Sequence, residues 1–458
     1  MLLARVIAFF GTTYLARTLG PEGFGTIGFA LATVGYFGVS ISAGLDEAGS
    51  LEVARHPHRA SSIASSMTVV RVGLAFVALG GLALLTYFLA KPFTVKIVLL
   101  ATGLSLLTVA LDTSWVYKGL AKNSIAGVAL VLGQALYVGG ALVIVQGPAD
   151  VAWVPLMQCL GELGAALLLG VFLLRIGPLH VDLSQGFKIL NNSWFLLTSK
   201  VGRIVLFTFD ILLLGFLFGE QAVGLYSAPY RICLLLLALA AVIQIAYLPA
   251  FAHAATQSSG ALSNVSERSW EVASAVTFPV MVGGWILAEP IIGQIFGAEY
   301  VGGVDAFKFL LLSLGCIMLY GGAHNVFLVQ QQTHIETRII VAGAVLNVLL
   351  NIALIPYFEL AGAAISRVAA EGFILAMGLF AVAKMGIRMP ARSVIRPFGA
   401  VVAMGICLVF VGRHIHWVGS VGLGFIVYAA FLTLLRGVPQ DIAPYLMNRP
   451  LLSPRRVG

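Results

Sequence analysis

The stretch GPEGFGTIGFA, which runs from Gly20 to Ala30, separates the first two apolar segments of the chain. A second stretch of the same form, GEQAVGLYSA, runs from Gly219 to Ala228, so the two leading glycines are 199 positions apart. Each stretch has another glycine five positions after its first, at Gly25 and Gly224, and then enters a new apolar segment. Glycine marks turns, and a turn that recurs at one large offset is typical of an internal repeat. The pattern predicts two related halves.

The composition is that of a membrane protein. Of the 458 residues, 60% are hydrophobic and only 10% are charged, whereas about 25% of the residues in an average soluble domain are charged. Apolar runs recur along the chain at the length of about 18 residues that crosses a bilayer as a helix. The net charge of +8 fits basic loops at a membrane surface better than a nucleic-acid site. We therefore expect an all-α polytopic membrane protein with no nucleic-acid partner.

Fourteen transmembrane helices are expected from the apolar windows between charges, glycines and prolines. Their bounds are 2–18, 22–43, 63–90, 96–116, 124–146, 151–174, 195–217, 223–250, 272–296, 304–328, 336–356, 361–383, 396–412 and 416–435. Lys and Arg concentrate in the loops on one side of the membrane. The loops on the other side have only Arg17, Lys91, Lys96, Lys308 and Arg413. Basic loops remain in the cytoplasm, so both termini are predicted to be cytoplasmic.

Two further matches support the repeat. The segment from Pro148 to Glu162 resembles the one from Pro356 to Glu371, and Trp115–Val116–Tyr117 matches Asn325–Val326–Phe327 at a similar offset. Each block has six spans, an even number, so both glycine turns lie on the outer face and the repeats are parallel, as in several transporters. We expect two six-helix lobes that face one another, at 1–175 and 194–385, joined by a cytoplasmic interfacial linker at 176–193, and two extra helices with a cytoplasmic tail at 386–458.

Charged residues inside the expected spans are the candidates for function, because an ionisable group in hydrocarbon is costly unless it is paired or faces water. Six cations outnumber four deep anions, and an arginine-rich cavity would suit an anionic head group, since guanidinium binds phosphate with paired hydrogen bonds. For any one residue, an interhelical salt bridge or a side chain that extends to the interface is the alternative. The cations are Arg5, Arg71, Lys200, Arg203, Arg231 and Arg367, and the anions are Asp112, Glu162, Asp210 and Glu371.

Enzyme motifs are absent from the sequence. It contains no Walker A loop, no HExxH and no GxSxG, and no loop exceeds about thirty residues. The loop histidines of HPH (His56, His58) and HIH (His414, His416) have no nearby cysteine or acidic ligands, so they are expected to be solvated. We expect no catalytic residue, no metal site and no cofactor.

Four segments carry a resemblance to a known family. They are ARTLGPEGFGTIGFA (16–30), LDTSWVYKGLAK (111–122), FDILLLGFLFGEQAVGLYSAPYRI (209–232) and LNVLLNIALIPYFELAGAAISRVAAE (346–371). Together they resemble the polysaccharide transporter family, the oligosaccharide and O-antigen flippases of the multidrug/oligosaccharidyl-lipid/polysaccharide exporter superfamily. The resemblance extends over residues 1 to about 390.

The resemblance implies a V-shaped, two-lobed transporter in a bacterial cytoplasmic membrane. Such a transporter moves a polyprenyl-diphosphate-linked oligosaccharide from the cytoplasmic to the outer leaflet by alternating access, alongside glycosyltransferases and a polysaccharide polymerase. Carried onto this chain, the resemblance makes the six cations above candidates for binding the diphosphate or acidic sugars. Glu162, Asp210, Glu371 and Asp112 become candidates for helix pairing or for coupling to protons or sodium ions.

Other functions remain alternatives to this flippase. A peptidoglycan-precursor flippase or a multidrug exporter would belong to the same superfamily, although an exporter of organic cations would be expected to have an acidic cavity. A membrane-embedded glycan polymerase or ligase would be expected to carry a large outer loop with catalytic residues. A purely structural scaffold would have no use for buried charges. Since the sequence has no nucleotide-binding motif, transport would be driven by an ion gradient, the membrane potential or removal of product, and we favour ion antiport.

Overall fold

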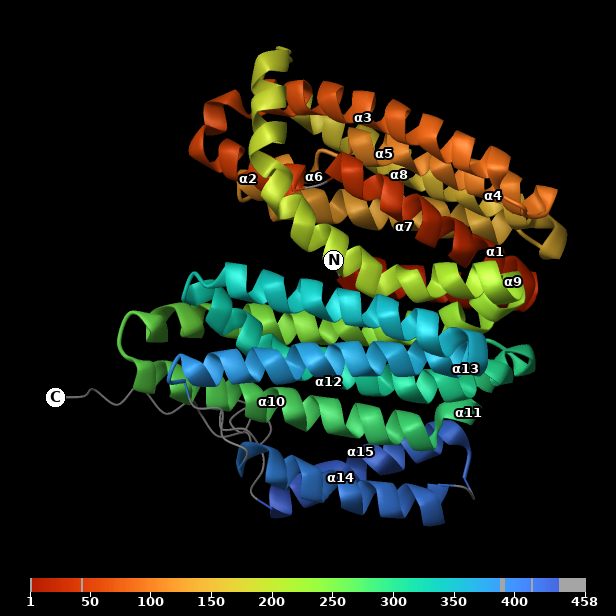
Figure 1. The fold of residues 1–458 in the computed structure, drawn as a ribbon, viewed down its shortest axis with the longest axis vertical. Helices are drawn as coiled ribbons and strands as arrows, with labels where there is room; N and C mark the ends of the chain where they lie inside the picture. The colour runs from red at the N-terminus through yellow and green to blue at the C-terminus, as the bar shows by residue number, and fades with distance from the viewer. Residues whose placement is uncertain (1, 43, 388–391, 413–414, 436–458) are drawn as a thin grey trace. The chain divides into compact units, whose positions relative to one another are not determined.

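The structure, a computed structural model, describes residues 2–42, 44–387, 392–412 and 415–435. These residues form helices and short connections, with no strand among them, and this confirms the expected all-α class (Figure 1). The helices are α1 (Leu2–Ser42), α2 (Leu45–Arg55), α3 (Ala60–Phe88), α4 (Phe93–Gly103), α5 (Ser105–Leu111), α6 (Ser114–Gly119), α7 (Asn123–Ile144), α8 (Trp153–Leu174), α9 (Leu183–Ala255), α10 (Ser259–Ile286), α11 (Ala288–Ile295), α12 (Val304–Val329), α13 (Thr333–Lys384), α14 (Arg392–Phe410) and α15 (Trp417–Leu434). Short 3-10 turns lie at Pro57–Arg59, Pro148–Ala152 and Ala298–Gly303.

Long apolar helices dominate the described part of the chain. Nine of its helical stretches are long and apolar enough to cross a membrane, or ten when α10 and α11, which meet at 78°, are taken as one bent span. Three of the nine, containing α1, α9 and α13, are interrupted at an internal residue and cover two expected spans each. Counting each of these as two, the bent pair as one and the shorter α14 as one reproduces the fourteen expected segments.

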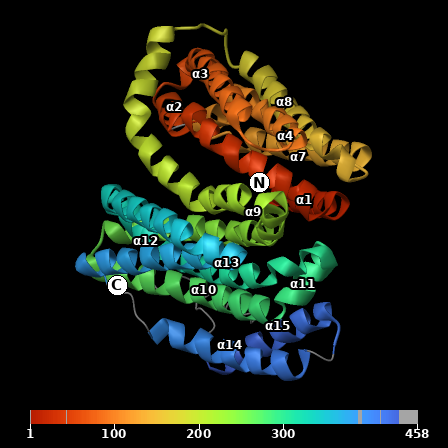
Figure 2. The ribbon, with the colours of Figure 1, turned by 45° about the vertical axis from the view of Figure 1, so that its right-hand side comes forward.

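The chain divides into two compact units, which are described separately. Unit 1 comprises Met1–Leu235, Gly293–Ala306 and Ile340–Ser366, and unit 2 comprises Leu236–Ile292, Phe307–Ile339 and Arg367–Gly458. In unit 1, α7 and α8 pack side by side (Figure 2), and Trp115, Tyr117 and Met67 belong to a buried apolar core. The lobe bounds expected from the repeat, 1–175 and 194–385, stay a prediction. The compact units divide the chain at other positions, because unit 1 contains the first part of α9 together with α1–α8.

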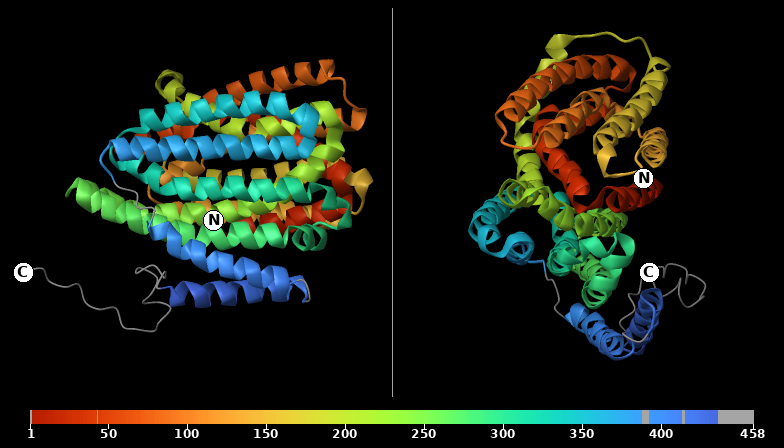
Figure 3. Two further views of the ribbon diagram at one scale, coloured as in Figure 1. Left: turned by 60° about the horizontal axis from the view of Figure 1, so that its bottom comes forward. Right: turned by 90° about the vertical axis from the view of Figure 1, so that its right-hand side faces the viewer.

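Unit 2 contains the two C-terminal helices. In this unit α14 packs against both α15 and α10 (Figure 3). Their contact is a small apolar core that includes Met404, Leu408 and Leu432, and the buried Tyr428 hydroxyl donates a 2.9 Å hydrogen bond to the carbonyl oxygen of Ala275 in α10. The two extra helices expected at 386–458 therefore pack as a helical hairpin on α10.

The two glycine turns of the sequence have the same backbone conformation. Gly20 has φ 67° and ψ 177°, and Gly219 has φ 82° and ψ −173°. This region of φ and ψ is essentially restricted to glycine, because a Cβ atom clashes with the backbone there. Each glycine therefore turns one expected span into the next, which confirms that the repeated sequence encodes a repeated structure.

Replacing Gly219 with Ala tests this backbone requirement. A Cβ atom at Gly219 would meet no other atom within 4 Å, so the substitution isolates the conformational strain. We expect Gly219→Ala to lower the free energy of unfolding by about 1–3 kcal/mol, measured as a loss of thermal stability in detergent. Gly73→Ala is the matched control, because Gly73 lies within α3 and its Cβ would also meet no atom within 4 Å. Equal melting temperatures for the two variants would contradict the prediction.

The two turns also contact each other within unit 1, through Gly25 and Gly224. A Cβ atom at Gly25 would lie 1.7 Å from the carbonyl oxygen of Glu220, and one at Gly224 would lie 1.8 Å from the carbonyl oxygen of Pro21. Pro21 and Glu220 each follow the first glycine of their turn, so the two close approaches are equivalent under the repeat. The backbones meet in a reciprocal, approximately two-fold contact that is open only to glycine.

Polar contacts surround this pair of turns. Lys91 pairs with Glu220 at 2.8 Å and donates a 2.5 Å hydrogen bond to the carbonyl oxygen of Gly215. Arg17 donates to the carbonyl oxygens of Gln294 and, at 2.8 Å, Ile295, where α11 ends. Of the basic residues expected on the outer side, Lys91 is thus held by the Gly219 turn and Arg17 by the end of α11.

Candidate functional site

An inner cavity of about 360 Å³ in unit 1 collects several of the predicted charges. It lies among α3, α5, α6, α7 and α8 together with the first turn of α2. Three carboxylates and two cations face it, so the fully ionised cavity carries one net negative charge. Its polar lining comprises Asp46, Arg71, Thr108, Asp112, Ser114, Lys118 and Glu162.

Arg71 connects three elements around this cavity. Its side chain is 1% exposed, it pairs with Asp46 at 3.2 Å, and it donates to the carbonyl oxygens of Asp112 at 3.0 Å and Val109 at 2.9 Å. Those carbonyls lie where α5 ends, and the expected span at 96–116 is broken there. A helix end inside a membrane needs partners for its free carbonyls. Arg71 supplies them, so the structure assigns it a fold-stabilising contact in addition to its place in the cavity.

The acidic residues of the cavity differ in their partners. Asp112 accepts hydrogen bonds from the backbone N–H and the hydroxyl of Ser114, at 2.9 and 2.8 Å, and so fixes the first turn of α6. Glu162 in α8 accepts one from the Thr108 hydroxyl and another, at 2.9 Å, from the Gln158 amide. Both partners of Glu162 are neutral, so this partly buried carboxylate has no cation in direct contact among the described residues.

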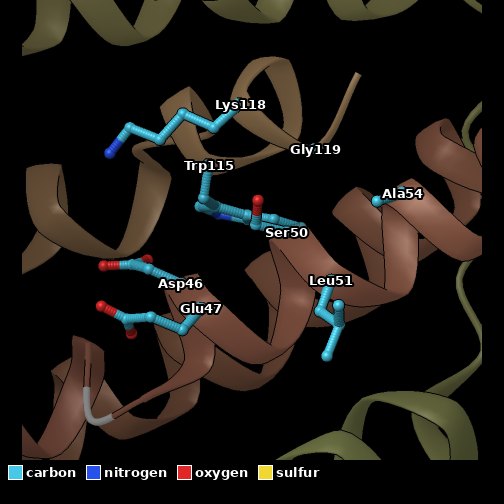
Figure 4. A pocket seen from close by; sticks show the side chains of 8 residues that line it. All are labelled: Asp46, Glu47, Ser50, Leu51, Ala54, Trp115, Lys118 and Gly119. Carbon is cyan, nitrogen blue, oxygen red and sulfur yellow. The ribbon is translucent and has the colours of Figure 1, made fainter. Parts of the chain in front are cut away.

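A second hollow, the surface pocket, lies next to the inner cavity and measures about 390 Å³. It is lined by α2 and α6 and shares Asp46 and Lys118 with the inner cavity. In Figure 4 the carboxylates of Asp46 and Glu47 and the ammonium of Lys118 extend towards the same side, and Trp115 lies between Lys118 and Ser50. The two hollows therefore adjoin at a pair of opposite charges.

Arg231 differs from the other predicted cations of unit 1. It lies in α9, is partly buried, and makes no ion pair or hydrogen bond with any residue that the structure describes. The titratable groups within its electrostatic reach are Tyr137 of α7 and Tyr230. Tyr137 is also within reach of Glu162, so the structure brings Arg231, Tyr137 and Glu162 into one neighbourhood.

The other predicted residues of unit 1 lie elsewhere. Arg5 in α1 and Arg203 in α9 are exposed, and the side chain of Lys200 lies outside the described residues. Asp210 is completely buried and accepts a 2.5 Å hydrogen bond from the Tyr226 hydroxyl, which returns from the far side of the Gly219 turn. Asp210 therefore links the two helices of that turn, while its expected roles in helix pairing or ion coupling stay predictions.

Unit 2 holds the remaining predicted pair. Arg367 and Glu371 in α13 are 1% and 7% exposed. A further acidic group of this unit was missed by the sequence reasoning: Glu336, which is 6% exposed, accepts hydrogen bonds from His324 at 2.7 Å and Tyr320 at 3.3 Å. Glu336 lies at the start of an expected span, where a carboxylate normally reaches water, so the sequence contains no signal for its burial.

Three residues of unit 1 were also missed. Asp46 follows the second expected span and lies in a connection between spans. Lys118 lies in one of the basic inner loops, and Tyr137 is one of many aromatic residues in the spans. A signal existed only for Asp46: Asp46 and Glu47 lie in the connection between the second and third expected spans, and the third span contains Arg71, a buried charge that favours pairing with a carboxylate.

Comparison with known proteins places these features in context. A family model described as polysaccharide biosynthesis protein matches residues 1–255, more than half of the chain. Over 368 residues the chain is 19% identical to a probable low-salt glycan biosynthesis flippase of Haloferax volcanii, covering 79% of this chain and 76% of the relative. It is 22% identical over 379 residues to a putative O-antigen transporter of Escherichia coli, covering 80% and 90%.

Solved structures share the fold. The lipid II flippase MurJ in an inward closed conformation matches with a TM-score of 0.81 and 13% identity, over 97% of this chain and 98% of that one. An inward-facing multidrug resistance MATE family transporter of the MOP superfamily matches with a TM-score of 0.66 and 14% identity, over 84% and 95%. At these identities the similarity shows a two-lobed transporter fold and says nothing of the substrate.

Proposed function

The chain belongs to the polysaccharide biosynthesis protein family, and from this premise we propose that it moves a polyprenyl-diphosphate-linked oligosaccharide across the cytoplasmic membrane of a bacterium. It does so as a transporter and makes or breaks no covalent bond. The glycan head of such a lipid is too polar to cross hydrocarbon unaided, whereas the tail stays in the bilayer. Two relatives whose names specify a glycan flippase and an O-antigen transporter support this substrate class.

Arg231 carries the proposal for the substrate. A guanidinium within a membrane span is costly unless it has an anionic partner or faces water, and no described residue supplies that partner. A diphosphate is the anion that guanidinium binds best, with paired and charge-assisted hydrogen bonds. Tyr137 and Tyr230 nearby add hydroxyl groups suited to a phosphate or a sugar. Arg5, Lys200, Arg203 and Arg367 extend the candidate set, with Arg71 contributing positive charge at the inner cavity.

Alternating access and ion coupling complete the proposal. The reciprocal contact of the glycine turns is a closed contact on the face that we infer to be outer, because the distribution of basic loops favours cytoplasmic termini. Glu162, with Asp112 in the same cavity, is the proposed coupling group, while Asp210 and Glu371 are further candidates. Glycosyltransferases would supply the lipid-linked glycan and a polysaccharide polymerase would consume it.

Arg231→Ala tests the substrate claim. The variant is expected to flip a fluorescent polyprenyl-diphosphate oligosaccharide in proteoliposomes at least about tenfold more slowly than the unmodified protein, because one charge-assisted phosphate contact is worth about 1.5–3 kcal/mol. Arg231→Lys should recover part of the rate. Arg55→Ala is the control, since Arg55 is an exposed arginine at the end of α2. Wild-type flipping by Arg231→Ala would exclude the proposed diphosphate contact, and no flipping by the unmodified protein would exclude the function.

A further inference from the structure

We propose that unit 1 contains a water-filled proton path that joins Glu162 to the surface pocket by way of Asp46. The path rests on the proposed function, because a proton that moves through it would drive the outward movement of the lipid-linked glycan. It identifies the coupling ion as a proton, and it identifies the side of unit 1 at which Glu162 exchanges that proton.

The two hollows provide the space for this path. The inner cavity of about 360 Å³ contains Glu162, and the surface pocket of about 390 Å³ is bordered by exposed residues of α2 and α6. They share Asp46 and Lys118. A water molecule occupies about 30 Å³ in the liquid and needs two to four polar partners. Both hollows are large enough for several waters, and each offers such partners.

Buried donors without acceptors point to water along the path. The Nε–H of Arg71, which lines the inner cavity, and the Nε1–H of Trp115, which lines the surface pocket, have no hydrogen-bond partner among the described residues. Each side chain is only 1% exposed. Buried donors almost always have an acceptor, so a water beside each one is expected. Such waters would in turn donate to Asp46 and the other carboxylates, which makes a chain that conducts protons.

The charges around Glu162 favour a proton over a metal cation. Arg71 and Lys118 face the same cavity and offset two of its three carboxylates, and no group of three or more His, Cys, Asp or Glu side chains that could hold a metal ion occurs among the described residues. A proton that joins a carboxylate leaves a neutral group, so it adds no free cation to a site that already contains two. The titratable and charged groups that face Glu162 from its own and the neighbouring helices are Asp46, Arg71, Asp112, Lys118, Tyr137 and Cys159.

The arrangement also gives Asp46 a distinct role. It lines both hollows and pairs with Arg71, so a proton that reaches Asp46 weakens its ion pair with Arg71, the residue whose hydrogen bonds hold the broken end of α5. Asp46 is therefore the relay between the pocket and the cavity, and Glu162 is the group at which the path ends.

Protonation is measured directly on the full-length protein in lipid vesicles, without substrate. A pH jump on the side of the surface pocket is followed by the infrared C=O stretching band of a protonated carboxyl. We expect the band in the unmodified protein and its loss in Glu162→Gln. In Asp46→Asn the band should appear at least about 100-fold more slowly, since one relay group of a proton transfer has been removed. Trp115→Phe, which deletes one water-binding donor and keeps an aromatic ring in the buried core, should slow it as well.

Glu52→Gln is the matched control, because Glu52 lies in the same α2 but lines neither hollow. A band that persists in Glu162→Gln, or one that appears at the wild-type rate in both Asp46→Asn and Trp115→Phe, would overturn the path. Flipping assays on the same vesicles keep the two proposals apart. Glu162→Gln should flip the lipid-linked glycan down its own gradient but gain nothing from an imposed pH gradient. If the unmodified protein shows the carboxyl band and does not flip, the proposed function fails and the path stands.

Discussion

Gly25→Ala is expected to abolish glycan export while the protein still inserts into the membrane. The added Cβ would lie 1.7 Å from the carbonyl oxygen of Glu220 and 2.7 Å from the backbone nitrogen of Gly224. No flexible side chain can move aside, because both obstacles are backbone, so the two turns must separate by more than an ångström. Overpacking of this kind costs about 1–3 kcal/mol and occasionally more. Export is measured by flipping in proteoliposomes, and insertion by the yield of monodisperse protein in detergent.

Two further variants make the result interpretable. Gly224→Ala should reproduce the loss, because its Cβ would lie 1.8 Å from the carbonyl oxygen of Pro21 in the reciprocal contact. Gly73→Ala in α3 should export normally, because its Cβ would meet no atom within 4 Å. If Gly25→Ala exports glycan at the normal rate, the closed contact of the turns plays no part in transport.

Arg71→Ala is expected to cause the largest loss of stability. The substitution leaves Asp46 without its 3.2 Å partner and leaves the carbonyls of Val109 and Asp112 without their hydrogen bonds. Each buried carbonyl left without a partner costs about 1–3 kcal/mol, and the lost ion pair adds less than a fully buried pair would, because the Asp46 side chain is 31% exposed, so the whole loss is about 3–5 kcal/mol. We expect a fall of that order in the free energy of unfolding, measured by thermal denaturation in detergent. A loss of less than about 1 kcal/mol, the range of exposed ion pairs, would contradict the role assigned to Arg71.

A double-mutant cycle separates the contributions at this site. Asp46→Ala alone should cost less than Arg71→Ala, because Arg71 keeps its two backbone carbonyls. In the double variant the coupling energy between the two residues is obtained from the departure from additivity. Additive losses would show that the carbonyl contacts alone explain the stabilisation by Arg71.

The repeated turns could be predicted from the sequence because their glycines reflect a backbone requirement. Gly20 and Gly219 adopt a conformation that other residues avoid, so the residue type itself reports the turn. The expected spans could also be predicted from the sequence, since the thickness of the hydrocarbon layer fixes the length of an apolar helix that crosses it. What could not be seen was that Gly25 and Gly224 touch, because contact between segments 199 positions apart depends on how the helices pack.

The candidate site could be predicted only in part. Arg71, Asp112 and Glu162 were identified because charges are rare in spans, and the structure brings all three to one cavity. The partner of Arg71 was missed, because Asp46 lies in a connection and the other two acceptors are backbone carbonyls at a helix break. Residues 96–116 form one apolar segment with a single internal charge at its C-terminal end, Asp112, and that charge was interpreted as a functional group and not as the sign of a helix break. Arg231 was identified as a charge, but its neighbours Tyr137 and Glu162 come from other helices.

The reciprocal glycine contact places the same requirement on both halves of the chain. In most interfaces a harmful substitution on one side can be relieved by a smaller residue opposite. Here the atom opposite each glycine is a main-chain oxygen, which every amino acid possesses, so no second substitution can make room. Elsewhere the two halves share only short sequence matches. At Gly25 and Gly224 each half requires glycine, because the obstacle to a side chain is the main chain of the other half.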